Sequence, residues 1–105
     1  MIEIMAIVRP NKTSATKQAL ININRPGYTC IRAVGRGKKT VEVILSDGKK
    51  LKTKLVSKRI FLIVVEDTAK QEVVQAIIDA NWSGNEGDGK IFVTKIVDSY
   101  NVHLE

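Results

Sequence analysis

Two stretches of the chain repeat one order of apolar and polar positions. In each stretch, a run rich in β-branched residues leads into apolar positions at helical spacing, and a second β-prone run follows. The first stretch predicts a strand over 2–8, a helix over 12–23 and a strand over 29–34. The second predicts a strand over 59–65, a helix that ends near residue 82 and a strand over 91–97. The predicted order is therefore βαβ, a long connection, and βαβ again.

Local signals predict where these elements begin and end. Pro26 stops the first helix, and the glycines of Gly35–Gly37 are expected to end the second strand. Thr68 and Gln71 have the spacing of a capping box at the start of the second helix. Trp82 continues the apolar face of that helix, so we expect its ring in the core or in a subunit interface.

Two βαβ halves predict the ferredoxin-like class of α+β fold. This split-βαβ sandwich has a four-stranded antiparallel sheet with two helices on one face, here as one domain over residues 1–105. Apolar residues occupy both parities of the strands at 2–8 and 59–65. Both faces of the sheet should therefore be covered, and a further copy of the chain is the simplest cover for the second face.

The connection over residues 36–57 is too long to be a passive loop in so small a domain. Asp47-Gly48 lies between two β-prone runs and predicts a hairpin turn. Ten basic residues against two acidic ones give residues 32–59 a net charge of +8, so the rest of the chain carries −2 of the total +6. We therefore expect a projecting cationic hairpin, which is either a solvated surface or a site for anions or an acidic partner.

Composition excludes several classes of protein. The chain has one cysteine, Cys30, which excludes an internal disulfide framework and fits a reducing cytoplasm. No apolar run approaches the roughly 20 residues that span a bilayer, and the first residues lack the pattern of a secretory signal. With one histidine and one cysteine there is no metal-ligand cluster and no catalytic constellation. We expect a cytoplasmic protein that is neither an enzyme nor inserted in a membrane.

Two glycine-rich segments are candidates for an anion site. From Gly84 the chain spells G-x-x-x-x-G-K, but a Walker A loop follows a strand and opens a helix, and here the order is reversed. Ile91 also stands where that motif needs a hydroxyl. Two interpretations remain open: a turn that needs glycine conformations, or a nest of backbone N–H groups with Lys90 as a point charge. The segment 35–39 has the same chemistry.

The residues resemble one family over nearly the whole chain, the PII nitrogen-regulatory signalling proteins. The resemblance rests on IEIMAIVRPNK at the start, Gly27-Tyr28-Thr29, VGRGKK at 34–39, Lys58, IVVED at 63–67 and GDGKIFV at 87–93. The last stretch is highly specific. The form GRGK after the second strand is similar to the subgroup associated with nitrogen-fixation operons.

The resemblance implies a homotrimer that binds ATP or ADP in the clefts between subunits. It also implies that residues 36–57 form a T-loop, which docks on a target protein such as the nitrogenase complex, glutamine synthetase or an ammonium channel. Lys39 and Lys58 would lie at the phosphate or 2-oxoglutarate carboxylate. The residues implied at the nucleotide are Ile7, Gly27, Thr29, Gly35, Arg36, Gly37, Lys38, Val64, Gly87, Asp88, Gly89 and Lys90.

The sequence departs from the family pattern at several of these positions. Lys38 replaces the usual arginine and loses its bidentate fork, and Lys39 replaces a glutamine that helps to hold Mg²⁺ and 2-oxoglutarate. Asn101 and His103 replace a usual pair of arginines. Binding of 2-oxoglutarate and Mg²⁺ is therefore left open. Residues 36–57 contain no tyrosine, which excludes uridylylation there.

Two alternative functions compete with a nucleotide-sensing regulator. A degenerate PII-like protein would have lost the metabolite site and would bind another small anion or a partner. RNA binding on the same fold is less favoured, because RNA-binding ferredoxin-like domains carry stacking aromatics on their central strands. Here those strands offer Phe61 alone, so we expect no nucleic acid partner.

Overall fold

The computed structural model describes residues 1–103, apart from the side chains of Lys38, Lys39 and Val41. Its main elements follow in the order β1 (Ile2–Val8), α1 (Thr13–Asn22), β2 (Thr29–Ile44), β3 (Lys50–Val65), α2 (Lys70–Asn81) and β4 (Gly89–Lys95). Two 3₁₀ turns, Pro10–Lys12 and Asp67–Ala69, precede the two helices. The predicted βαβ–connection–βαβ order is confirmed.

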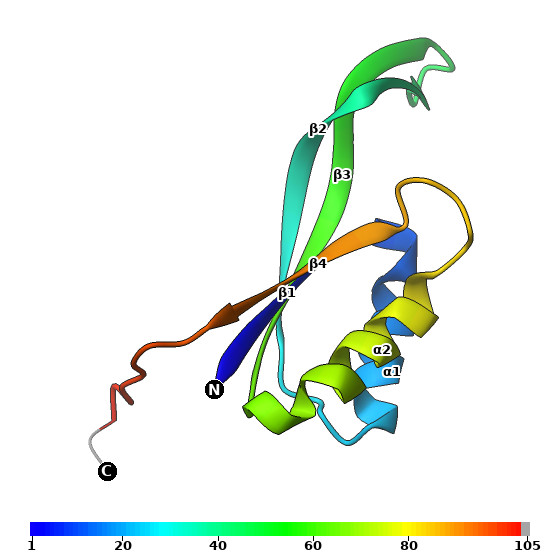
Figure 1. The fold of residues 1–105 in the computed structure, drawn as a ribbon. Coiled ribbons are helices and arrows are strands. Elements are labelled where there is room, and N and C mark those ends of the chain that lie inside the picture. Colours follow the sequence, from blue (N-terminus) through cyan, green and yellow to red (C-terminus); the bar gives the residue numbers. More distant parts are fainter. Residues whose placement is uncertain (104–105) are drawn as a thin grey trace.

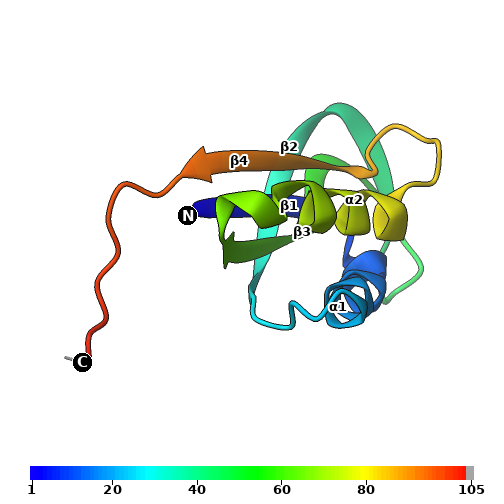
Figure 2. The same ribbon diagram turned by 60° about the horizontal axis from the view of Figure 1, so that its bottom comes forward.

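The four strands form one antiparallel sheet in the order β2-β3-β1-β4. Both helices lie on the same side of this sheet, and they contact each other (Figure 1). This is the ferredoxin-like arrangement that the sequence predicts. The residues after β4 run away from the body of the molecule (Figure 2), and Tyr100 there is exposed.

The core lies between the helices and one face of the sheet. Alternate residues of β1 and β3 point to this side, and Ile4, Phe61 and Ile63 are almost fully buried against Leu20 of α1 and Val73 of α2. Two polar side chains also lie between the helices. Asn81 donates to the Thr16 hydroxyl oxygen at 3.0 Å and so links the end of α2 to α1.

The opposite face of the sheet has no helix over it, and we call it the open face. Three of its hydrophobic residues, Ile31, Val64 and Phe92, are exposed in the single chain. The strand registers assign to it Met5, Ile7, Ile31, Ile60, Leu62, Val64 and Phe92. The prediction that both parities of the central strands are apolar is thus confirmed, and the open face needs a cover from outside the chain.

The strands around the long connection extend further than predicted. β2 does not end at the glycines of Gly35–Gly37 but continues to Ile44, and β3 begins at Lys50. Neither glycine has a positive φ, and the two strands form one hairpin that pairs up to Arg36 and again from Val41, with a register shift between them. The predicted turn is confirmed, because the Gly48 N–H donates to the Leu45 carbonyl at 2.9 Å and Gly48 has a φ of 84°.

The capping box predicted at the start of α2 is wrong, and so is a core position for the ring of Trp82 at its end, while a position in a subunit interface stays a prediction. The helix begins at Lys70, and its N-cap residue Ala69 makes no side-chain capping bond, so Thr68 and Gln71 form no capping box. Trp82 is the C-cap, with extended backbone at φ −65° and ψ 127°. Because the chain leaves the helix there, the Trp82 ring leaves the apolar face and is 71% exposed. No helix in the described part of the chain has the length and apolar content to cross a membrane.

Candidate functional site

The open face carries five of the twelve residues predicted to bind nucleotide. Strand pairing assigns Ile7 of β1, Val64 of β3 and Thr29 of β2 to this face. Lys90 pairs with Ile7 across β1 and β4, and Gly35 has the same parity as Thr29 further along β2. Residues that are far apart in sequence therefore share one surface.

A second lysine accompanies Lys90 on the open face. Lys58 of β3 pairs with Ala33 of β2, two residues before Ile60, which in turn pairs with Ile7. Lys58 and Lys90 thus stand on opposite sides of the apolar pair formed by Ile7 and Ile60. The Lys90 ammonium lies 5.5 Å from the centre of the Phe92 ring. This face offers an apolar surface with two positive charges, which suits an aromatic ring that carries phosphates.

The first glycine segment lies within β2 and is not a loop. Gly35 pairs with Val56, and Arg36 pairs with Leu55 and points to the face opposite Gly35. A register shift follows between Arg36 and Val41. An added Cβ at Gly35 or Gly37 would meet nothing within 4 Å. The side chains of Lys38 and Lys39, which the sequence places in the site, lie outside the described residues.

The second glycine segment is a loop that requires glycine conformations. Gly84, Gly87 and Gly89 have φ values of 80°, 86° and 136°, which other residues rarely adopt. A Cβ on Gly89 would stand 2.4 Å from the Ile7 carbonyl oxygen, because β4 begins there against β1. Position 89 thus requires glycine for two reasons: the backbone of β1 lies too close for a side chain, and φ is positive.

Arg9 holds this loop to the end of β1. Its Nε donates to the Gly87 carbonyl at 2.9 Å, and its Nη2 donates to the Glu86 carbonyl at 2.7 Å. Its Nη1 also lies 3.8 Å from the Asp88 carboxylate. This role of Arg9 is not predicted from the sequence. The contact joins residues 78 positions apart, and no local pattern near Arg9 signals it.

Asp88 turns back into the loop instead of pointing to the open face. Its carboxylate accepts the Ser83 backbone N–H at 2.7 Å and the Ser83 hydroxyl in a short hydrogen bond. These bonds, together with Arg9, hold the pKa of Asp88 below its usual value. The carboxylate thus occupies part of the N–H nest inside the loop. A direct contact between Asp88 and a nucleotide stays a prediction.

The two glycine segments lie at opposite edges of the sheet. β2 and β4 are the edge strands, and β3 and β1 separate them. Neighbouring strands are about 4.8 Å apart, so the gap is about 14 Å across three strand spacings. Because of this separation, one chain cannot bring both segments to one small anion. Gly27 lies on the chain just before β2, and it is exposed.

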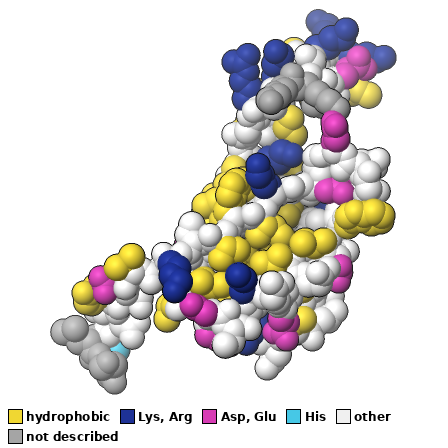
Figure 3. All heavy atoms as spheres, in the orientation of Figure 1, with side chains coloured by type: hydrophobic (Ala, Val, Ile, Leu, Met, Phe, Trp, Pro, Cys, Tyr) yellow, Lys and Arg dark blue, Asp and Glu magenta, His cyan; other side chains and the backbone are white. Residues whose placement is uncertain are grey.

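The charge of the hairpin is concentrated toward its end. Lys and Arg side chains gather there, while hydrophobic side chains cover the middle of the view (Figure 3). Within β3, Lys50, Lys52 and Lys54 alternate with Leu51 and Leu55. The lysine side of β3 gives the hairpin a basic face, to which β2 adds Glu42 opposite Lys52 and Ile44 opposite Lys50. The leucine side gives an apolar face, and both leucines are exposed. Within residues 1–103 no three His, Cys, Asp or Glu side chains are grouped as a metal site.

Residues 1–105 match a sequence model of the family described as "Nitrogen regulatory protein P-II". The chain is 38% identical over 107 residues to "Nitrogen fixation nifHD region glnB-like protein 2" of Methanococcus maripaludis, covering 93% of this chain and 88% of that protein. It is 34% identical over 111 residues to the protein of similar name from Methanothermobacter marburgensis, at 97% and 92% coverage. "Nitrogen regulatory protein GlnK2" of Haloferax mediterranei is 34% identical over 99 residues, at 94% and 80% coverage.

These matches agree with the motifs and with the fold. Proteins of this family act as trimers that regulate nitrogen metabolism, and they are signalling proteins rather than enzymes. The names of these relatives also agree with the predicted likeness to the subgroup associated with nitrogen fixation. The chain belongs to the nitrogen regulatory protein P-II family.

Proposed function

We propose that the protein is a nitrogen-metabolism regulator that binds ATP or ADP in clefts between the subunits of a homotrimer. The observation that supports this most strongly concerns Gly27, Gly35 and Gly37. None has a positive φ, and a Cβ on any of them would meet nothing within 4 Å. The described part of the chain thus gives no reason for glycine at these positions. A ligand or a second chain lying against the backbone is such a reason.

The sheet topology explains why the site would lie between chains. Gly35 is on one edge strand and the loop at Gly87–Gly89 precedes the other. If subunits abut edge to edge, β2 of one chain comes next to β4 of its neighbour. The two glycine segments then face one cleft, and the phosphates lie between them.

The open face supports a trimeric assembly. Ile31, Val64 and Phe92 are 43%, 51% and 45% exposed in the single chain. A contiguous apolar sheet face of this kind marks an interaction surface. In a trimer the open faces would turn inward and cover one another, and Ile7 and Val64 would then lie where an adenine ring enters between chains.

The hairpin supports a docking role for residues 36–57. Its basic face and apolar face together fit a target surface that has an apolar patch with acidic residues around it. Each ligand state would favour one hairpin conformation through its own contacts at the base of the hairpin. The nitrogenase complex is the first target to test, followed by glutamine synthetase and an ammonium channel.

A second candidate is a regulator that no longer senses 2-oxoglutarate. Lys39 favours it, because an ammonium group cannot accept a hydrogen bond and repels Mg²⁺. Such a protein would respond to nucleotide alone or to another small anion.

Calorimetric titration separates the two candidates. ATP, ADP and 2-oxoglutarate are added singly and together, with and without Mg²⁺. Nucleotide binding that 2-oxoglutarate strengthens supports the full sensor, and nucleotide binding that ignores 2-oxoglutarate supports the second candidate. The absence of nucleotide binding at millimolar concentration would contradict both.

The Lys90→Ala variant tests the site itself. Loss of a charge-assisted hydrogen bond to phosphate should weaken ATP binding roughly tenfold or more, while the assembly state in sedimentation stays unchanged. Lys95→Ala is the matched control, since Lys95 is also on β4 but pairs with Ile2 on the helix side of the sheet. Equal ATP affinity in the two variants would show that Lys90 is not part of the nucleotide site.

A further inference from the structure

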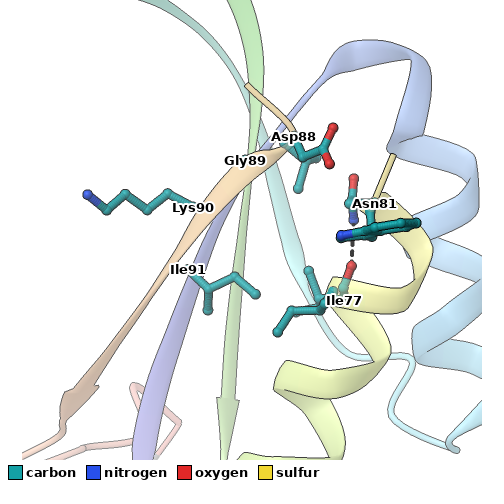
Figure 4. A pocket seen from close by; sticks show the side chains of 9 residues that line it. Ile77, Asn81, Asp88, Gly89, Lys90 and Ile91 are labelled. Atoms are coloured by element: carbon teal, nitrogen blue, oxygen red, sulfur yellow. Dashed lines mark hydrogen bonds between the residues drawn. The ribbon is translucent and has the colours of Figure 1, made fainter. Parts of the chain in front are cut away.

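Two arginines lie opposite each other where the hairpin leaves the body of the sheet. Arg32 of β2 pairs with Arg59 of β3. Arg59 has the same parity as Phe61, which is buried in the core, so both arginines are on the helix side of the sheet. Figure 4 shows Lys90 of the proposed nucleotide site pointing to the side of β4 away from α2. The arginine pair and the nucleotide site are therefore on opposite faces of the sheet.

The strand pairing brings the two arginine side chains close together. The Ile96 N–H donates to the Met1 carbonyl, so odd-numbered residues of β1 direct their backbone groups to β4 and even-numbered ones to β3. Val8 is even-numbered and pairs with Arg59, whose backbone groups therefore point to β1 and not to β2. Arg32 and Arg59 thus form a non-hydrogen-bonded pair, in which opposite Cβ atoms are about 4.5–5.5 Å apart. Like charges in such a pair repel each other.

No described carboxylate compensates these two charges. Neither arginine makes an ion pair within residues 1–103. Residues 4–41 and 48–65 contain no Asp or Glu, so α1 and the paired parts of β2 and β3 at this level carry no negative side chain. Arg59 is half-buried, and its Nη1 donates to the neutral Lys58 carbonyl at 3.1 Å. An anion from outside the chain would supply the missing charge.

Ser57 adds a hydroxyl to the same face. It lies two residues before Arg59 on β3, opposite Val34 of β2, and it is exposed. On the other side of the arginine pair, the next pair on this face is Cys30 with Phe61, at the edge of the core. The apolar core keeps water from one side of the guanidinium groups, which strengthens their attraction for an anion. Two guanidinium forks and a hydroxyl together suit the several oxygens of a phosphate.

We propose that Arg32, Arg59 and Ser57 bind the phosphate group of a small molecule at the base of the hairpin. The dianion lies between the two guanidinium groups, removes their repulsion and accepts the Ser57 hydroxyl. A single carboxylate has one charge and two oxygens, so it compensates the pair less well. The site shares no residue with the proposed nucleotide site. A ligand there would link β2 to β3 just before the register shift that follows Arg36.

Urea denaturation in matched salts tests the proposal on the wild-type protein. Inorganic phosphate, glycerol 3-phosphate, succinate and chloride are compared at neutral pH and equal ionic strength. At least one phosphate compound should raise the denaturation midpoint above its value in chloride, because a ligand that binds only the folded chain stabilises it. The compound with the larger effect identifies the free anion or an ester as the ligand. Equal midpoints in all four salts, or the largest effect from succinate, would overturn the proposal.

Variants separate binding from the general stabilising effect of phosphate salts. Arg32→Gln should be at least as stable as the wild type in chloride, because the repulsion is gone. Its affinity for the phosphate compound, measured by calorimetry, should fall at least about tenfold, as expected for a lost charge-assisted hydrogen bond. Lys54→Gln removes one positive charge from the same hairpin and should keep the wild-type affinity. Equal affinities in the two variants would contradict the site.

Two further variants complete the test. Arg59→Gln should lose phosphate binding as Arg32→Gln does, and if it does not fold, Arg32→Gln still decides, since that side chain is exposed. Lys90→Ala distinguishes this site from the proposed nucleotide site. It should keep the phosphate stabilisation that depends on Arg32, while Arg32→Gln should keep the wild-type affinity for ATP. A phosphate effect that is lost in Lys90→Ala and kept in Arg32→Gln would assign the anion to the open face and overturn the proposal.

Discussion

The two glycine segments have similar composition and opposite physical reasons for their glycines. In the loop before β4, Gly84, Gly87 and Gly89 all have positive φ, and Gly89 is packed against the backbone of β1. In β2, Gly35 and Gly37 have neither positive φ nor a close neighbour. The loop glycines therefore serve the fold of their own chain. Within the described residues those of β2 have no comparable reason, which fits the proposed contact with a ligand or another subunit.

This difference also shows what a glycine motif can and cannot prove. The loop that looked most like a phosphate site has a complete explanation within the chain, down to the carboxylate of Asp88 in its own nest. The less conspicuous segment is the better evidence for a ligand. Substitutions at the two segments should therefore separate stability from binding.

Gly89→Ala should have the largest effect. A methyl group there meets the Ile7 carbonyl oxygen and forces an unfavourable φ, so the free energy of unfolding should fall by about 3 kcal/mol. Urea denaturation followed by circular dichroism measures this. Gly27→Ala is the control and should stay within about 1 kcal/mol of the wild type. A stable Gly89→Ala variant would mean that β4 does not begin as close to β1 as described.

Gly35→Ala should give the reverse result. Its stability should be equal to that of the wild type or higher by up to about 1 kcal/mol, since alanine reduces the entropy of the unfolded chain. Its affinity for ATP should fall at least about tenfold, which corresponds to about 1.4 kcal/mol. Calorimetry and urea denaturation on the same sample measure both. Unchanged affinity for ATP would show that ligand binding is not the reason for glycine at position 35.

Arg9→Ala should have a smaller effect, of about 1 kcal/mol on the free energy of unfolding, because the two lost hydrogen bonds are partly exposed. Amide hydrogen exchange should become faster in residues 83–88 and stay the same in the hairpin. Arg32→Ala, which removes an exposed arginine of β2, is the control. Equal protection of the loop in both variants would show that Arg9 does not hold it.

The Asp88→Asn substitution should have the smallest effect on the free energy of unfolding, and this effect should depend on pH. A carboxyl whose pKa is lowered by folding stabilises the protein above its ordinary pKa of about 3.9, and this contribution is lost as the pH falls through the lowered value. The difference in stability between wild type and Asp88→Asn should therefore be constant near neutral pH and shrink below about pH 4. A difference that grows in acid would contradict the hydrogen bonds described for Asp88.

Element order and fold could be predicted because they depend on periodicity. β1 has the predicted bounds, since its alternation of buried and half-buried residues is unbroken from Ile2 to Val8. The ends of β2 and β3 could not be predicted from glycine alone. Glycines predict a strand end, but Gly35 pairs with Val56 of β3, and pairing resumes at Val41 after a register shift that contains Gly37, so β2 continues.

The errors around α2 and the loop have local and long-range causes. Helical spacing assigned Trp82 to an apolar face, but the helix ends one residue earlier and the backbone direction changes. Arg9 acts on residues 78 positions away, and one sequence contains no signal for such a pair. The residues of the open face could be named from the family resemblance, but their common surface depends on strand register.

The length of the paired hairpin has a mechanical consequence. The molecule measures 55 Å along its longest axis against 30 and 23 Å across, and the hairpin of β2 and β3 and the segment after β4 extend it in opposite directions (Figure 1). From Gly35 to Ile44 the arm is about 30 Å long at about 3.3 Å per residue. A rotation of about 10° at the register shift after Arg36 would carry its tip through about 5 Å. The hairpin therefore amplifies motion. A shift of less than one ångström at its base is enough to displace the whole surface near its tip.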